Sequence, residues 1–169
     1  LTGQIKAGRY AIDGGVSSQF VSGLLMAMPL MGALSELSLT GVVESADYIH
    51  ITTDAMSKFG VCINISSDGR TYTVHPGGYT SPRRISVEGD WSNGAFWLAS
   101  NSLGSDIDVS NLDSNSKQGD REIVNILKLL AAGMSTVSAR DIPDLVPVLA
   151  VAAAAKHGAV FTDIRRLRM

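Results

Sequence analysis

Two glycines, two serines and a glutamine follow one another where the chain changes from a strand-like to a helix-like pattern. Gly14 and Gly15 supply flexible backbone, Ser17 and Ser18 supply hydroxyl groups, and Gln19 supplies an amide. The free N–H groups and the positive dipole end of a helix N-terminus make such a position a natural anion site. The simpler interpretation is a serine N-cap after a turn, and the spacing alone favours it.

A second helix-like run begins in a similar way. Ser45, Asp47 and Tyr48 stand at its start. The spacing alone favours a cap formed by Ser45, with Tyr48 packed in the core. A hydroxyl and a phenol that face a ligand are the alternative.

Asp144 follows Asp141-Ile142-Pro143 and precedes the most apolar helix-like run of the chain. One interpretation is that Asp144 is the N-cap of this helix. The other is that its carboxylate, held at the edge of an apolar helix, takes part in proton transfer. The spacing does not separate the two.

Alternating strand-like and helix-like runs must position these residues. The first set is predicted as strand, helix, strand, helix, strand and strand, over 4–13, 17–28, 36–40, 45–59, 61–66 and 71–74. After a Pro- and Gly-rich loop over 75–84, strands are predicted over 84–88, 105–109, 134–139 and 160–164, and helices around 96–98 and over 120–132 and 145–157. This alternation predicts an α/β (α+β) fold with helices packed behind a sheet. It amounts to two copies of one βαβαβ-type unit, the second altered after Gly133.

Hydrophobic spacing also predicts which side chains are buried. The first helix is expected to bury an apolar stripe, Phe20, Val21, Leu24, Leu25 and Met28. The second is expected to bury Tyr48, Ile51, Met56 and Phe59. Trp91 and Trp97 are assigned to the core, and Cys62 is expected to be a half-buried structural thiol.

Composition narrows the classes of function. Of 169 residues, 45% are hydrophobic and 18% are charged, and the net charge is −2. Such a chain can build a core, so it is not intrinsically disordered, and it has no electrostatic reason to bind nucleic acid or an acidic membrane. One cysteine excludes an intramolecular disulfide framework, and the histidines lack metal-ligand spacing. The longest strongly apolar stretch, 145–155, is too short to span a bilayer, and a cytoplasmic location is expected.

Four segments, in order along the chain, resemble motifs of the 5-enolpyruvylshikimate-3-phosphate synthase family. Residues 14–27 resemble its serine-serine-glutamine segment, and residues 87–92 resemble its Val-Glu-Gly-Asp-x-Ser segment between domains. Residues 141–147 resemble its Ile-Pro-Asp motif. Arg166-Leu167-Arg168 is similar to the residues directly before the family's Lys-Glu-Ser-Asp-Arg run. The resemblance implies domains built of repeated βαβαββ units.

The resemblance also implies a reaction and a set of binding residues. The family transfers the enolpyruvyl (carboxyvinyl) group of phosphoenolpyruvate to the 5-hydroxyl of shikimate 3-phosphate, without a metal or organic cofactor. Ser17 and Ser18 are then expected to bind shikimate 3-phosphate, and Gln19 to reach both substrates. Ser45 is expected to contact the substrate phosphate, and Tyr48 to line the pocket for the sugar ring.

Asp144 is the one catalytic residue that the resemblance implies. It is expected to contact the shikimate hydroxyls and to take part in proton transfer at the 5-hydroxyl. The related UDP-N-acetylglucosamine enolpyruvyl transferase and a non-catalytic folded module, in which Ser17 and Asp144 only cap helices, are the alternatives.

The chain begins at Leu1 and ends at Met169, before the family's cationic run. Residues 1–84 are therefore expected to form the C-terminal part of the first domain, and residues 85–169 a truncated part of the second. The stretch between Gly133 and Asp141 is shorter than in the family. We expect this fragment to be inactive by itself and either to self-associate or to expose apolar patches, whereas the parent enzyme is expected to be a monomer.

Overall fold

The structure, a computed structural model, describes residues 3–168, apart from the side chains of Arg166 and Arg168. It divides into two units, Leu1–Ser86 and Val87–Met169. The boundary lies close to the one expected from the sequence between residues 84 and 85. The assignment of each unit to a domain of an enzyme stays a prediction.

Unit 1 has the strand and helix order predicted from the sequence. Its elements are β1 (Arg9–Asp13), α1 (Ser18–Ala27), a 3₁₀ turn η1 (Met28–Leu30), β2 (Ser35–Thr40), α2 (Ala46–Lys58), β3 (Ile63–Ile65) and β4 (Thr71–Val74). The sheet order is β1-β2-β4-β3. Strands β1 and β2 are parallel, with Ile12 opposite Leu39, and the other neighbours are antiparallel. The expected mixture of helices and strands is confirmed.

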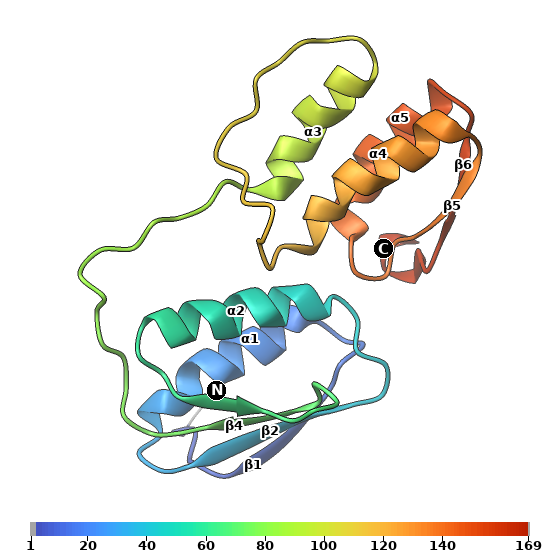
Figure 1. Ribbon diagram of the computed structural model, residues 1–169. Helices are drawn as coiled ribbons and strands as arrows, with labels where there is room; N and C mark the ends of the chain where they lie inside the picture. Colours follow the sequence, from blue (N-terminus) through green and yellow to red (C-terminus); the bar gives the residue numbers. More distant parts are fainter. Residues whose placement is uncertain (1–2, 169) are drawn as a thin grey trace. The chain divides into compact units, whose positions relative to one another are not determined.

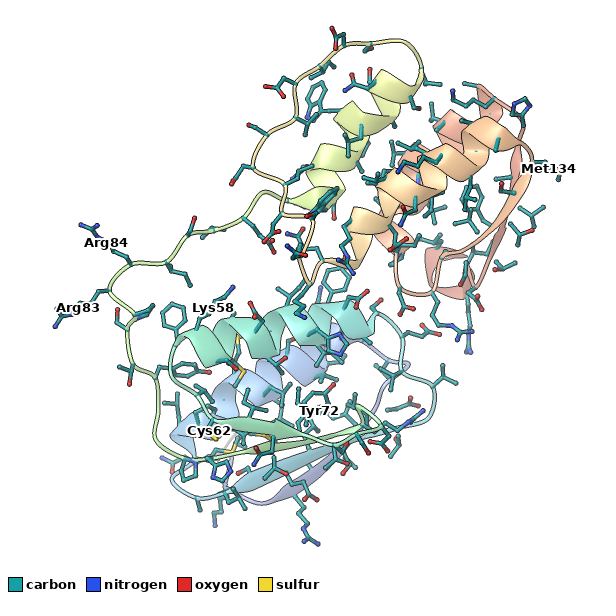
Figure 2. All side chains as sticks on the ribbon, in the orientation of Figure 1. Lys58, Cys62, Tyr72, Arg83, Arg84 and Met134 are labelled. Atoms are coloured by element: carbon teal, nitrogen blue, oxygen red, sulfur yellow. The ribbon has the colours of Figure 1, made fainter. Side chains whose placement is uncertain are left out.

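Both helices of unit 1 lie side by side on one face of its sheet (Figure 1). The core between the helices and the sheet contains Val21, Leu25, Leu37 and Val74. Tyr72 also lies between the sheet and the helices (Figure 2). Burial raises the pKa of the Tyr72 phenol. A hydrogen bond of 2.7 Å between the hydroxyls of Ser22 and Thr52 joins α1 to α2.

The buried stripes differ in part from those predicted. On α1, Phe20 is 63% exposed, and Leu24 is only half-buried. On α2, the buried residues are Ile49, Thr53 and Met56. Tyr48, Ile51 and Phe59 are half-buried. The helix is therefore rotated so that Ile49, rather than its neighbours, faces the sheet.

Cys62 is exposed, so the expectation of a half-buried thiol is wrong. The register explains the difference. Ile63 pairs with Val74, whose side chain is buried under the helices. Because successive side chains of a strand point to opposite faces, Cys62 lies on the solvent face, opposite His75. The His75 N–H donates to the Cys62 carbonyl at 3.0 Å.

Unit 2 is built mainly of helices. Its elements are α3 (Trp91–Ser102), a 3₁₀ turn η2 (Gly119–Glu122), α4 (Ile123–Ala132), β5 (Ser135–Ser138), a 3₁₀ turn η3 (Pro143–Leu145), α5 (Val146–Ala154), β6 (Ala159–Thr162) and a 3₁₀ turn η4 (Arg165–Arg168). Strands β5 and β6 form a parallel pair (Figure 1). The core contains Ile123, Leu130, Leu145 and Leu149, each fully buried.

The strands predicted over 84–88 and 105–109 do not form, although both ranges are described. At the second range, the side-chain amide of Asn101 takes the place of a neighbouring strand. Its Nδ2 donates to the Ile107 carbonyl at 2.7 Å, and its Oδ1 accepts from the Ile107 N–H at 2.8 Å. The second unit is therefore not a copy of the first. Trp91 is buried as predicted, whereas Trp97 is 54% exposed, which corrects its assignment to the core.

Candidate functional site

The predicted binding residues of unit 1 lie at one edge of its sheet. Parallel strands β1 and β2 end together, with Asp13 opposite Thr40, and each is followed by a loop and a helix. The N-termini of α1 and α2 therefore meet at the same edge (Figure 1). We call residues 13–19 and 40–48 the loop edge of unit 1. The carboxyl ends of parallel strands are where open α/β sheets commonly bind ligands.

The two loops of this edge are packed directly on each other. Gly14 N–H donates to the Thr40 carbonyl at 2.9 Å, and Glu44 N–H donates to the Gly14 carbonyl at 3.2 Å. A Cβ atom on Gly14 would lie 2.9 Å from Val43 Cγ2 and 3.0 Å from Val43 Cα. Only glycine fits this contact, so the first glycine of the motif sets the spacing between the two helix starts.

Ser17 is the N-cap of α1, as the simpler interpretation proposed. Its backbone is extended, with φ −168° and ψ 130°, and its Oγ accepts the Gln19 N–H at 3.2 Å. Ser18 is the first residue of the helix and is only 7% exposed. Within residues 3–168, Ser18 Oγ makes no hydrogen bond, and no buried side-chain oxygen there lacks a partner, so this oxygen reaches solvent. A serine hydroxyl without a protein partner stands at the helix start, next to the exposed amide of Gln19.

Ser45 occupies the N-cap position of α2 in a strained conformation. Its φ of 55° and ψ of 44° are left-handed, and its side chain makes no capping hydrogen bond. The expected side-chain cap is therefore absent from this helix start. Left-handed backbone costs a residue with a side chain about 1–2 kcal/mol, and it persists where the surroundings enforce it. Ser45 is 1% exposed, so the packed loop holds it in place.

Tyr48 lies in the first turn of α2, and its N–H donates to the Ser45 carbonyl at 3.2 Å. It is half-buried rather than packed in the core, so part of its ring remains accessible. Its neighbour Asp47 lies 3.4 Å from His50 Nδ1, measured from Oδ1. The start of α2 thus carries a half-buried tyrosine next to an Asp–His pair.

Sequence reasoning missed one cation of this region, Arg70. Its guanidinium Nη1 donates to the Gly41 carbonyl at 2.8 Å, although the two residues are far apart along the chain. The antiparallel register of β2 and β4 brings them together, with Ser38 opposite Thr71. The strands over 61–66 and 71–74 were predicted from the sequence, but the pairing of the second with β2 was not.

A polar cluster stands where the parallel strands of unit 2 end. Asp163 accepts hydrogen bonds from Ser138 Oγ at 2.6 Å, from Arg140 Nη2 at 3.2 Å and from Thr162 Oγ1 at 3.4 Å. The Ser138 hydrogen bond, followed by the contact with Arg140, lowers the pKa of the Asp163 carboxyl. The cluster ties the end of β5 to the end of β6.

Asp144 lies in the 3₁₀ turn η3, directly before Leu145, the N-cap residue of α5. It is therefore not the N-cap of the helix, which corrects the simpler interpretation. The buried residues Ile142 and Leu145 anchor the turn on both sides of the exposed Asp144. Asp144 belongs to unit 2, whereas the predicted binding residues belong to unit 1.

The described residues contain no group of three or more His, Cys, Asp or Glu side chains arranged for a metal ion. Over the same part of the chain, none of the helices has the length and apolar character that crossing a membrane requires.

Comparisons with known proteins converge on one enzyme family. The family model of EPSP synthase (3-phosphoshikimate 1-carboxyvinyltransferase) matches residues 2–139. A 3-phosphoshikimate 1-carboxyvinyltransferase of Clostridium kluyveri is 38% identical, over 100% of this chain and 43% of the relative. The enzyme of the same name from Clostridium novyi is 33% identical, over 100% of this chain and 42% of the relative. The one from Methanocorpusculum labreanum is 37% identical, over 94% of this chain and 41% of the relative. The chain thus spans about two fifths of the length of these relatives.

Proposed function

The chain belongs to the EPSP synthase family, and from this membership we propose that it contributes the shikimate 3-phosphate site to a carboxyvinyl transferase. The reaction joins the 5-hydroxyl of shikimate 3-phosphate to C2 of phosphoenolpyruvate and releases inorganic phosphate. Unit 1 binds the phosphorylated acceptor at its loop edge. Asp144 of unit 2 handles the proton of the attacking hydroxyl.

One observation carries the acceptor site. The loop edge of unit 1 holds the starts of two helices together and presents the Ser18 hydroxyl, which lacks a hydrogen-bond partner within residues 3–168. Helix N-termini offer free N–H donors and a positive dipole end, which suit a phosphate dianion. Hydrogen bonds to an ionised phosphate are shorter and stronger than those between neutral groups.

The remaining residues of the edge have complementary roles in this proposal. The Ser17 and Ser45 hydroxyls donate to the acceptor, Ser45 to its phosphate. The exposed amide of Gln19 reaches the acceptor and phosphoenolpyruvate, and the accessible face of Tyr48 lines the sugar ring.

The chemistry needs a proton acceptor at the 5-hydroxyl. As the bond from the hydroxyl oxygen to C2 forms, its proton passes to the Asp144 carboxylate, and C3 of the enolpyruvyl group gains a proton. The tetrahedral adduct then loses phosphate and a proton from C3, which restores the double bond. A carboxylate held in an anchored turn can serve as such a base, a role that contributes typically about 10²–10⁴-fold to rate. No metal or organic cofactor enters these steps.

Binding is the appropriate test, since the chain spans only part of its relatives. Calorimetric titration of the 169-residue chain with shikimate 3-phosphate should give saturable heat, and Ser18→Ala should weaken binding by roughly tenfold or more, because a hydrogen bond to a charged group is lost. Ser57→Ala is the matched control. Ser57 is an exposed serine near the other end of α2, and its Oγ donates to the Thr53 carbonyl at 2.9 Å.

Equal affinities for the wild-type chain and Ser18→Ala would contradict the assignment of the loop edge. Heat with UDP-N-acetylglucosamine, and none with shikimate 3-phosphate, would identify the related transferase instead. A chain that binds neither acceptor at millimolar concentration would be a non-catalytic module.

A further inference from the structure

Arg70 holds the end of β2 from two sides. Its backbone carbonyl accepts the Leu39 N–H at 2.8 Å, and its guanidinium Nη1 donates to the Gly41 carbonyl at 2.8 Å. The side chain thus reaches across the end of the strand to the first residue of the loop that leads to α2. Within the described part of the chain, Gly41 is the one hydrogen-bond acceptor of this guanidinium.

The loop that Arg70 holds has little freedom of its own. Gly41 has a φ of +65°, and a Cβ atom there would lie 2.8 Å from Asp13 Oδ1. At the other end of the loop, the Glu44 N–H donates to the Gly14 carbonyl at 3.2 Å, and Ser45 follows in the left-handed conformation. The loop is therefore fixed at Gly41 by Arg70 and at Glu44 by Gly14, directly before Ser45.

We propose that Arg70 is a positioning residue for the phosphate site of unit 1. Its guanidinium fixes the Gly41 carbonyl, and through the short loop it fixes the strained Ser45. The inference rests on the proposed function for its ligand, the phosphate of the acceptor. If Arg70 acts on Ser45 through the backbone, its replacement must change the loop whether or not a ligand is bound.

Charge gives Arg70 a second effect at the same place. The loop edge and its helix starts carry Asp13, Glu44 and Asp47, whose carboxylates repel a phosphate dianion. The Arg70 guanidinium carries a positive charge and retains N–H donors beyond the one used by Gly41. Arg70 therefore offsets part of the local negative charge.

The test compares Arg70→Met and Arg70→Lys with Arg84→Met in the 169-residue chain. Arg84 is exposed and its side chain points away from the sheet and helices of unit 1, so its loss removes the same charge without touching the loop edge (Figure 2). One measurement is hydrogen exchange, without ligand, at the Glu44 and Gly14 amides, which donate to the Gly14 and Thr40 carbonyls. The other is the Kd for shikimate 3-phosphate by calorimetry.

Arg70→Met should speed exchange at these amides and weaken binding, each by about tenfold or more, because the loop loses a charge-assisted hydrogen bond. Arg70→Lys keeps the charge but not the planar fork, so it should recover part of the affinity and less of the protection. Arg84→Met should match the wild type in both measurements.

Unchanged exchange at these amides in Arg70→Met would overturn the inference, and so would equal weakening of binding in Arg84→Met. A wild-type chain that binds no shikimate 3-phosphate would overturn the proposed function. In that case the exchange measurement still decides whether Arg70 positions the loop. If Arg70→Met fails to fold, as judged by circular dichroism, the same comparison is made with Arg70→Lys.

Discussion

The hydroxyl of Ser17 can cap a helix and bind an anion at the same time. As a cap, its oxygen accepts the Gln19 N–H at 3.2 Å. A serine hydroxyl has one donor and two acceptor lone pairs, so the cap leaves its proton available to a phosphate. The two interpretations of the serine pair are therefore compatible. Ser17 holds the helix start in place, whereas the Ser18 hydroxyl has no such structural role within residues 3–168.

Asp163 is expected to make the stability of unit 2 depend on pH. Its pKa is lowered from the usual 3.8, first by the Ser138 hydrogen bond and then by Arg140. The folded state therefore favours the carboxylate. This stabilisation is present above the unfolded pKa and is lost as the pH falls through the lower folded pKa. Asp163→Asn should thus lower the urea midpoint at pH 7, and the difference from wild type should shrink towards pH 3.

Asp106→Asn is the matched control for this measurement. Asp106 is exposed, and within residues 3–168 its side chain takes part in no hydrogen bond or ion pair. Both Trp91 and Trp97 lie in unit 2, so tryptophan fluorescence follows its unfolding. A deficit of Asp163→Asn that is equally large at pH 3 and pH 7 would show that the carboxylate charge is not the cause.

At the scale of elements, the contact of Gly14 with Val43 sets how the two loops of unit 1 pack. In Gly14→Ala, the new Cβ would lie 3.0 Å from Val43 Cα, a backbone atom that cannot move without its loop. We expect this variant to lower the free energy of unfolding by about 1–3 kcal/mol, the usual cost of overpacking. Urea unfolding followed by far-UV circular dichroism measures the change.

Gly23→Ala is a control with the opposite expected sign. Gly23 lies inside α1 and is exposed, and a Cβ atom there would meet nothing within 4 Å. Alanine in a helix interior is more stable than glycine by roughly 0.5–1 kcal/mol. A Gly14→Ala chain as stable as the wild type would mean that the two loops separate at little cost.

The elements of unit 1 could be predicted from the sequence because their signals are local. The serine pair before an apolar stripe marked the start of α1, and the strand-like runs over 61–66 and 71–74 marked β3 and β4. The pairing of β2 with β4 is not local, so the contact of Arg70 with Gly41 could not be predicted. The spacing alone favoured capping roles for Ser17 and Ser45, and only the family resemblance implied that they bind substrate; neither indicated Arg70.

Unit 2 shows where short strand-like runs mislead. A run of a few apolar residues becomes a strand only if a partner strand accepts its backbone. Around residue 107 the Asn101 amide satisfies the backbone, and residues 84–88 form no strand. The interpretation of Asp144 as a cap failed because the helix is preceded by the 3₁₀ turn that contains Asp144. Neither the hydrogen bonds of the Asn101 amide nor the 3₁₀ turn produces a periodic pattern in the sequence.

At the scale of the whole molecule, some of the large apolar side chains are exposed rather than buried. Phe96 and Trp97 are each 54% exposed on α3, and Met134, labelled in Figure 2, is 71% exposed. Adjacent exposed aromatic residues of this kind commonly mark association surfaces. The expected self-association of the chain stays a prediction.

The connection between the units should be the first site of proteolysis. Residues 81–87 are all exposed and form neither helix nor strand, and Arg83 and Arg84 lie among them (Figure 2). Exposed segments with few contacts are preferred for cleavage because a protease must bind an extended stretch of chain. Brief trypsin treatment should therefore cut after Arg83 or Arg84 and leave two fragments close to units 1 and 2, identified by mass spectrometry.

Lys117 is the informative competitor, because it is also exposed and lies in a loop. Its neighbours are tied down, however. The Ser116 hydroxyl donates to Glu88 Oε1 at 2.8 Å, and Gln118 Nε2 donates to the Gly89 carbonyl at 2.9 Å. Cleavage at Lys117 should consequently be slower by roughly tenfold or more, in proportion to the cost of opening these hydrogen bonds. In a chain with Arg83→Gln and Arg84→Gln, the early fragments should disappear. A first cut after Lys117 in the wild-type chain would show that the Glu88 contacts do not hold this loop.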